Sequence, residues 1–309
     1  MSDHRSHAVV IGGGTMGSGI ALVFAAGDWA VDVVEPQATT RAALPAYLRE
    51  SLQRMGAAAD TGRVAIAASL DDVEWRDVEL VIESANEDLA LKRELFAQLE
   101  ARAPAQIPLA SNSTTLPMSA ISQGLRTRSR MLGLHFLMPA QFVPVVEVIA
   151  SPRTDPQVLD DIAALMRRLG KRPVRLAKEQ PGWLVNRIQT ALMREALALI
   201  DQGIASPEDV DAAVRYGFGF RYAACGPIMQ KEHSGWDINC KLQEAVFPSL
   251  CNDTAPSATM KRMIAARHLG MKTGRGFLRW DDASIAREKA RYEKALRATL
   301  DILEAGDRG

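Results

Sequence analysis

With 309 residues, the chain is long enough to bury a sizeable core and to divide into two domains. Lysine plus arginine and aspartate plus glutamate both number 37, so the formal net charge is zero and indicates neither a nucleic-acid nor a membrane-surface partner. We expect a soluble protein, because no apolar run is as long as a membrane span and the short polar N-terminus does not resemble a signal peptide. Three cysteines without CxxC spacing argue against a disulfide framework and a metal site, and they suit a cytoplasmic location.

Short apolar runs alternate with segments of helical period in the first half of the chain. Near-continuous apolar runs indicate strands that are buried on both faces of a sheet, so we predict a doubly wound, mostly parallel α/β domain. The predicted strands are Ala8–Ile11, Ala30–Glu35, Leu80–Glu83, Ile107–Ala110, Met131–Phe136, Val145–Ile149 and Pro173–Leu176. Helical periodicity is clear at Met16–Gly27 and Leu89–Ala101.

The pattern changes to helices near residues 179–182. Leu184–Ile200 predicts a long amphipathic helix, and Ser206 followed by Pro207 is typical of a helix start. The run Gly276–Leu278 is strand-like, and Ala283–Ala305 predicts a terminal amphipathic helix. We therefore predict an α/β domain over residues 1–180 and an all-helical C-terminal domain over residues 181–309, which would serve substrate binding and dimerisation.

A glycine-rich turn follows the first predicted strand and fits the pattern GxGxxG. Gly12 permits a tight turn, Gly14 lets the backbone approach a pyrophosphate, and Gly17 allows close packing of the following helix. The N–H groups at the start of that helix would bind the anion. The residues predicted to bind the cofactor here are Gly12, Gly14, Thr15, Met16 and Gly17.

Glu35 ends the second predicted strand, at the position where a Rossmann domain places its ribose-binding acid. A carboxylate there accepts hydrogen bonds from ribose hydroxyls and repels a 2′-phosphate. The first domain therefore predicts a Rossmann fold with NAD, and not NADP, as its cofactor. The alternative for Glu35 is a solvated acid at a strand end.

His135, at the end of an apolar strand, is the candidate general base, because strand ends line the ligand cleft of such a sheet. Glu147 interrupts the strand Val145–Ile149, so it is either exposed at a sheet edge or buried with a partner, for which a histidine is suited. The hydroxyls of Ser111–Thr115 and the amide of Asn186 are expected to face the same cleft.

Together, these motifs resemble the 3-hydroxyacyl-CoA dehydrogenase family from about Ala8 to Trp280. The resemblance is carried by the runs Gly12–Ala21, Leu80–Glu83 with Glu87 and Lys92, Ser111–Leu116, Leu134–Phe136, Val146–Ile149, Pro181–Arg187 and Gly270–Phe277. The resemblance implies that His135 removes the hydroxyl proton of the substrate and that Glu147 orients the imidazole of His135. It also implies that Thr114 occupies the position of the family's catalytic serine and that Asn186 hydrogen-bonds the substrate oxygen.

The resemblance further places Glu87 and Lys92 along the ribose on the nicotinamide side of the cofactor. The implied reaction is the NAD-dependent oxidation of the 3-hydroxyl of a 3-hydroxyacyl-CoA to the 3-keto form, as in fatty acid metabolism. A non-catalytic NAD-binding or structural protein is the alternative from another class. The set of His135, Glu147 and Asn186 favours an enzyme.

Two departures from the family leave the substrate open. Met138 stands where the family has an asparagine after the catalytic strand, which removes a polar group near the substrate. Arg221 lies in a run that looks more like relatives acting on free hydroxy acids, such as gulonate and carnitine dehydrogenases. It would bind a substrate carboxylate, or else it is a surface arginine that caps a loop.

The apolar sides of Leu184–Ile200 and Ala286–Leu303 are larger than one small domain needs, which favours a homodimer. The alternative is that both are ordinary core helices.

Overall fold

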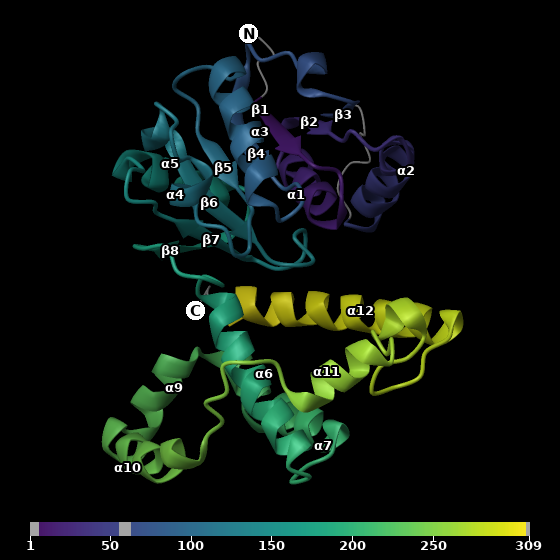
Figure 1. The fold of residues 1–309 in the computed structure, drawn as a ribbon, viewed down its shortest axis with the longest axis vertical. Coiled ribbons are helices and arrows are strands. Elements are labelled where there is room, and N and C mark those ends of the chain that lie inside the picture. Colours follow the sequence, from purple (N-terminus) through teal and green to yellow (C-terminus); the bar gives the residue numbers. More distant parts are fainter. Residues whose placement is uncertain (1–5, 56–62, 307–309) are drawn as a thin grey trace. The chain divides into compact units, whose positions relative to one another are not determined.

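The computed structural model describes residues 6–55 and 63–306 and divides into two compact units, Met1–Arg187 and Ile188–Gly309 (Figure 1). The first unit contains an eight-stranded sheet with the order β3-β2-β1-β4-β5-β6-β7-β8. Its strands are β1 His7–Ile11, β2 Ala30–Val34, β3 Val64–Ala67, β4 Val78–Glu83, β5 Leu109–Ser111, β6 Met131–Phe136, β7 Val145–Ile149 and β8 Arg172–Leu176. All neighbours in the sheet are parallel except β6 and β7, which are antiparallel.

Helices cover both faces of this sheet, which confirms the doubly wound Rossmann domain (Figure 1). One apolar cluster joins the sheet to α1, α2 and α5, through buried side chains such as Phe24, Leu48 and Met166. The other joins it to α3 and α4, through Phe96 and Ile121. The bounds of these helices are α1 Thr15–Ala26, α2 Ala38–Arg54, α3 Leu89–Arg102, α4 Met118–Ile121 and α5 Pro156–Arg168.

Two details of the strand prediction differ from the structure. The edge strand β3 is missing from the prediction because it has only four residues and a mixed burial pattern, so it carries no clear apolar period. The run Gly276–Leu278 forms no strand in the described residues: the neighbouring Arg275 makes only isolated bridges, with Gly270 and Arg279.

The second unit is helical, as predicted. Ser206 accepts a hydrogen bond from the N–H of Asp209 and so caps α7, which confirms the predicted helix start. The helices are α6 Val185–Asp201, α7 Pro207–Ala212, α8 Phe220–Ala224, α9 Pro227–Ser234, α10 Trp236–Val246, α11 Ala258–Ala265 and α12 Asp282–Gly306, with a π-helical turn at Ala213–Gly219. The division between the units falls within α6, so the predicted domain boundary after residue 180 stays a prediction.

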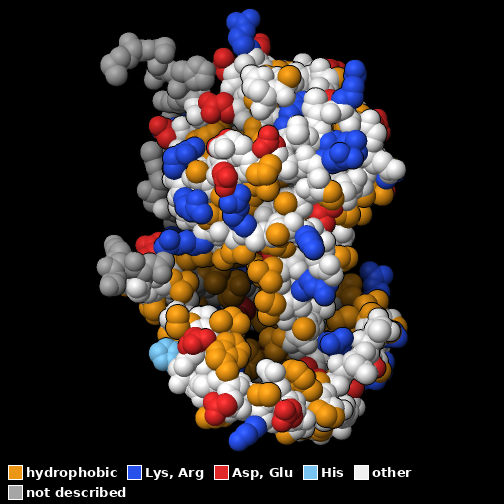
Figure 2. Space-filling model, turned by 90° about the vertical axis from the view of Figure 1, so that its left-hand side faces the viewer, with side chains coloured by type: hydrophobic (Ala, Val, Ile, Leu, Met, Phe, Trp, Pro, Cys, Tyr) orange, Lys and Arg blue, Asp and Glu red, His pale blue; other side chains and the backbone are white. Residues whose placement is uncertain are grey.

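Large apolar side chains are exposed on this helical unit. Ile188 on α6 and Ile302 on α12 are both about 60% exposed, and no residue of α12 is buried. Figure 2 shows hydrophobic side chains gathered on the surface of this unit, in the lower half of the view. No helix among residues 6–55 and 63–306 is both long and apolar enough to cross a membrane.

Candidate active site

The glycine-rich turn between β1 and α1 has the geometry that a dinucleotide requires. A Cβ atom on Gly12, whose φ is 100°, would lie 2.7 Å from the carbonyl oxygen of Ser84, and one on Gly17 would lie 1.8 Å from that of Gly12. Only glycine fits these two positions. Gly14 has open space at its Cβ position and caps α1 without a side-chain hydrogen bond. The backbone at Gly14 is therefore open on this side, and the binding of a pyrophosphate by the first N–H groups of α1 stays a prediction.

Glu35 follows β2 directly and points its carboxylate at this turn. One carboxylate oxygen accepts a hydrogen bond from the N–H of Gly13 at 2.8 Å, and the other accepts one from the N–H of Gln37 at 2.8 Å. The side chain of Arg41 lies nearby and donates to the carbonyl oxygens of Glu35 and Pro36 at 2.8 and 2.9 Å. Glu35 is thus held beside the turn by groups of the protein itself, and its ribose contact stays a prediction.

His135 and Glu147 form a buried pair across the antiparallel strands β6 and β7. They are directly opposite in register, and Nδ1 of His135 lies 2.7 Å from Oε2 of Glu147. Their residues are 4% and 0% exposed, so of the two alternatives for Glu147 the structure shows burial with a partner. The carboxylate does not lie exposed at an edge.

The remaining contacts of Glu147 keep its carboxylate ionised. Oε1 accepts the N–H groups of Leu184 and Val185, at the start of α6, at 2.8 and 2.9 Å. Burial raises the pKa of Glu147, but the hydrogen bonds from His135, Val185 and Leu184 outweigh it and hold the pKa below its ordinary value. An ionised carboxylate only accepts hydrogen bonds, so this contact selects the tautomer of the neutral imidazole that has its proton on Nδ1 and its lone pair on Nε2.

The start of α6 is tied to the loop after β5. Trp183 is 3% exposed, has a positive φ of 49°, and donates its indole N–H to the carbonyl oxygen of Ser113 at 2.8 Å. Asn186 is half-buried on the first turn of α6, next to the Val185 N–H that Glu147 accepts. The sequence pattern assigned no role to Trp183, because neither its partner nor its backbone conformation is visible in a hydrophobic period.

The loop after β5 is fixed by Glu87, which the prediction placed at the cofactor. Its Oε1 accepts Ser113 Oγ at 2.6 Å, and the N–H and hydroxyl of Thr115 at 2.7 and 2.8 Å. Burial raises the pKa of Glu87, but these bonds and the nearby charge of Lys92 outweigh it and lower the pKa. Thr114, between the two anchored residues, is exposed.

Lys92 is almost fully buried, at 1% exposure, and its ammonium is bound within the protein. Nζ lies 2.6 Å from Oε1 of Glu83, 3.2 Å from the carbonyl oxygen of Ala85 and 3.6 Å from Oε2 of Glu87. Glu83 also accepts the hydroxyl of Ser111 at 2.6 Å. These contacts assign Lys92 to an internal ion pair, and its predicted place along the ribose stays a prediction.

Asn112 is a further residue of the site that the sequence reasoning missed. Its Oδ1 accepts the N–H of Phe136, next to His135, at 2.7 Å, and its Nδ2 donates to Ser84 Oγ at 3.3 Å. It therefore bridges the ends of β4, β5 and β6. The only signal in the sequence was its place within the polar run after β5.

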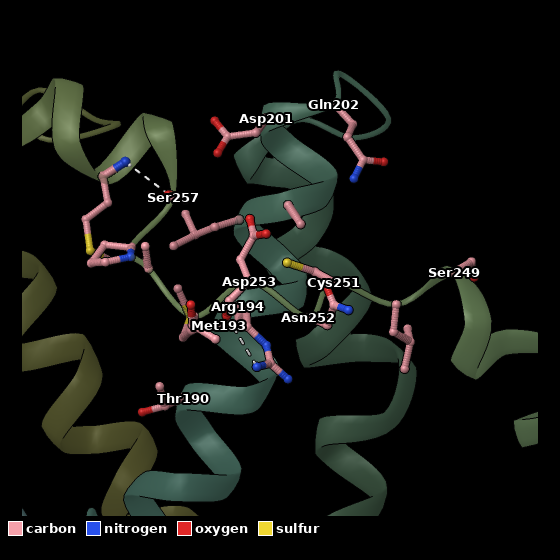
Figure 3. Close-up of a pocket in the computed structure, with 17 residues that line it drawn as sticks. Thr190, Met193, Arg194, Asp201, Gln202, Ser249, Cys251, Asn252, Asp253 and Ser257 are labelled. Atoms are coloured by element: carbon pink, nitrogen blue, oxygen red, sulfur yellow. Dashed lines mark hydrogen bonds between the residues drawn. The ribbon is translucent and has the colours of Figure 1, made fainter.

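The helical unit contains a pocket of about 840 Å³ between α6, residues 249–257 and α11 (Figure 3). Arg194 in this pocket donates to the carbonyl oxygen of Asp253, and Asp201 accepts the N–H of Thr259. Arg221 lies on α8, is exposed, and is not among the residues that line the pocket. Its binding of a carboxylate stays a prediction. Within the described parts of the chain, no cluster of His, Cys, Asp and Glu could hold a metal ion.

Comparison with known protein families gives two matches that together span most of the chain. The model of the 3-hydroxyacyl-CoA dehydrogenase NAD binding domain matches residues 7–180. The model of the 3-hydroxyacyl-CoA dehydrogenase C-terminal domain matches residues 182–280.

Two of the most similar relatives are dehydrogenases named for different substrates. The chain is 31% identical to 5-formyl-3-hydroxy-2-methylpyridine 4-carboxylate 5-dehydrogenase of Mesorhizobium japonicum, over 96% of this chain and 97% of the relative. It is 32% identical to the mitochondrial hydroxyacyl-coenzyme A dehydrogenase of Rattus norvegicus, over 89% of this chain and 91% of the relative.

Solved structures are similar to the chain as well. A crystal structure of 5-formyl-3-hydroxy-2-methylpyridine 4-carboxylic acid 5-dehydrogenase, described as an NAD-dependent dismutase, matches with a TM-score of 0.91, 27% identity, and coverage of 97% of this chain and 99% of that one. FadB2 of M. tuberculosis matches with a TM-score of 0.74, 31% identity, and coverage of 90% and 100%.

Proposed function

Because the chain belongs to the 3-hydroxyacyl-CoA dehydrogenase family, we propose that it oxidises a hydroxyl-bearing carbon of a small free carboxylate, with His135 as the general base. The family makes it an NAD-dependent oxidoreductase that acts on CH–OH groups. The observation that carries the proposed mechanism is the 2.7 Å contact between His135 and Glu147, which leaves Nε2 of the imidazole free to accept a proton.

The reaction needs one proton acceptor and one hydride acceptor. When bound, NAD supplies the hydride acceptor. The hydroxyl proton moves to Nε2 of His135 as the C–H bond breaks, so an alcohol loses two electrons and two hydrogens and becomes a carbonyl. Glu147 stabilises the imidazolium that forms and keeps the ring in the required tautomer. His135 then releases the proton to water.

The proposed site also contains four further residues, Thr114, Asn186, Glu87 and Lys92. Asn186 on the first turn of α6 would donate to the substrate oxygen, and the exposed hydroxyl of Thr114 would do the same. Glu87 holds the loop that carries Thr114, so we assign it a positioning role in addition to its proposed cofactor contact. Lys92 pairs with Glu83, which in turn accepts the hydroxyl of Ser111, directly before the same loop.

A free carboxylate is supported as the substrate by the relative whose match spans both chains almost completely. That relative is named for a pyridine carboxylate, and a solved structure of an enzyme of the same name gives a TM-score of 0.91 against 0.74 for FadB2. Arg221 and Met138, which depart from the pattern of acyl-CoA enzymes, point the same way. Arg221 is the residue that we propose for the carboxylate. The second candidate, a 3-hydroxyacyl-CoA, is supported by the match to both family models.

The test is NADH formation with matched substrates. The panel consists of 3-hydroxybutyryl-CoA, the free acids 3-hydroxybutyrate, gulonate and carnitine, and an aromatic aldehyde that bears a carboxylate, whose hydrate offers a CH–OH group. Preference for free acids supports the proposal, whereas preference for the thioester favours the second candidate. The variant His135→Ala should lose turnover and keep its affinity for NAD.

We also propose a homodimer, located in the cytoplasm. The exposed apolar side chains on α6 and α12, such as Ile188, Met193 and Ile302, support association with a second copy through the helical unit. The unpaired cysteines Cys225, Cys240 and Cys251 suit a reducing compartment. Size-exclusion chromatography with light scattering gives the mass in solution. The mass of a monomer at micromolar protein concentration would contradict the proposed dimer.

A further inference from the structure

The loop that joins β6 to β7 connects the two strands of the proposed catalytic pair. It covers residues 137–144, so it begins just after His135 and Phe136 and ends just before β7, which carries Glu147. Its backbone is compact, because the N–H groups of Phe142 and Val143 both donate to the carbonyl oxygen of Pro139, at 3.0 and 2.9 Å. The loop therefore directly connects the strand of the proposed base to the strand of its carboxylate partner.

Lys171 holds this loop from one side. Its residue is 6% exposed, and Nζ donates to the carbonyl oxygens of Ala140 and Val143 at 2.6 and 3.0 Å. The next residue adds a third bond, from the N–H of Arg172 to the carbonyl oxygen of Pro144 at 2.8 Å. Three carbonyl groups of the loop are therefore bound by Lys171 and by Arg172, the first residue of β8.

The ammonium of Lys171 has no carboxylate partner within the described residues. Burial accordingly lowers its pKa from 10.5 to about 8. A buried charge without a counter-ion is unfavourable for folding, and an apolar side chain such as methionine would avoid that energy. What the lysine adds in return is a pair of hydrogen bonds to buried carbonyl groups of one loop.

The dinucleotide helix supports the same loop from the other side. A Cβ atom on Gly19 of α1 would lie 3.1 Å from Cβ of Ala140 and 3.0 Å from Oε1 of Gln141, so α1 and the loop are in close contact. Ala140 is 2% exposed. Its carbonyl group binds Lys171 while its methyl group faces α1, whose first turn follows the glycine-rich turn.

We propose that Lys171 is a positioning residue that holds the β6–β7 loop against α1 and thereby sets the distance between the general base and the cofactor. This inference rests on the proposed function, because it assumes that the substrate lies between the two and gives its carbon-bound hydride to NAD and its hydroxyl proton to His135. Geometry of this kind is sensitive, since a displacement of about 1 Å at a reacting centre is associated with a rate loss of about 100-fold.

The variant Lys171→Met tests the proposal, with Lys178→Met as the matched control on an exposed lysine after β8. We expect the affinity for NAD to stay within about threefold and kcat to fall by about 10- to 100-fold, with a smaller change in KM. The amides of Phe142 and Val143 should exchange faster with deuterium, while those of α3 keep their rates. The NMR signal of the His135 Nδ1–H should shift or broaden in Lys171→Met and stay unchanged in Lys178→Met.

A second variant reaches the loop without altering the lysine. Gly19→Ala places a methyl group against Ala140, and it should give the same loss of kcat and the same change at His135. Wild-type kcat in both variants would overturn the proposal, as would faster exchange spread evenly over the whole first unit. If the wild type turns over no substrate of the panel, the proposed function fails, whereas the exchange and His135 signals still decide whether Lys171 positions the base.

Discussion

Nδ1 of His135 lies 2.7 Å from a carboxylate oxygen of Glu147, and the two residues are directly opposite each other in an antiparallel strand pair. The other carboxylate oxygen binds the backbone N–H groups of Leu184 and Val185. One buried carboxylate thus orients the proposed base and also fixes the start of α6, where Asn186 lies. The placement of the proposed base and of the amide proposed to bind the substrate depends on the same side chain.

The variant Glu147→Gln should lower kcat by roughly 10²- to 10⁴-fold, the range typical of positioned acid–base catalysis. A neutral amide can donate to Nδ1, which would put the imidazole proton on Nε2 and remove the acceptor. The affinity for NAD should be unchanged, because no contact of Glu147 involves the glycine-rich turn. Stopped-flow measurement of NADH formation with a titration of NAD checks both. Full turnover in a folded variant would exclude the assigned role of Glu147.

A second prediction concerns Glu35, whose carboxylate occupies a small anion site. It accepts two backbone N–H groups, from Gly13 and Gln37, and Arg41 lies beside it. In Glu35→Ser these groups are left free for a 2′-phosphate. We expect the affinity for 2′,5′-ADP to rise at least about tenfold in calorimetry and the affinity for NAD to fall.

The double variant Glu35→Ser with Arg41→Ala serves as the control, because it keeps the backbone groups and removes the guanidinium. It should lose most of the gained affinity for 2′,5′-ADP. Equal binding by the single and double variants would show that Arg41 takes no part in the choice of cofactor.

Local patterns predicted the residues that form a tight turn or pair with a direct neighbour in the sheet. The apolar runs located most strands, and GxGxxG located the turn whose glycines the structure requires. Glu147 was paired with His135 because a carboxylate inside an apolar strand needs a partner. Asn112, Trp183 and Lys171 could not be found in this way, because each binds backbone groups that are distant in sequence. Backbone donors and acceptors are the same for almost every residue type, so such contacts are not visible in the sequence.

Trp183 gives a third prediction, on stability. In Trp183→Phe the ring stays apolar, but the carbonyl oxygen of Ser113 loses its indole donor. An unsatisfied buried carbonyl costs about 1–3 kcal/mol, so the free energy of unfolding in urea should fall by about that amount. The exposed Trp236 offers a control, since Trp236→Phe removes a surface hydrogen bond to Glu232 and should change the same quantity by less than about 1 kcal/mol.

The fourth prediction is the dependence of stability on pH that Lys171 causes. Its pKa is about 8 in the folded protein against 10.5 for an ordinary lysine, because the ammonium is buried. Between these two pH values the unfolded chain binds a proton that the folded protein lacks, so stability rises as the pH rises. The penalty is complete below about pH 8 and is relieved above 10.5. Its full size corresponds to about 3 kcal/mol.

Other groups also titrate in this range, so the measurement is the difference between wild type and Lys171→Met. The free energy of unfolding in urea is determined for both at pH 7.5, 9 and 10.5. The wild type should gain up to about 3 kcal/mol relative to the variant over this series, because only the wild type is relieved of the buried charge. A constant difference would mean that Lys171 keeps its proton throughout and that its two carbonyl partners stabilise the ammonium fully.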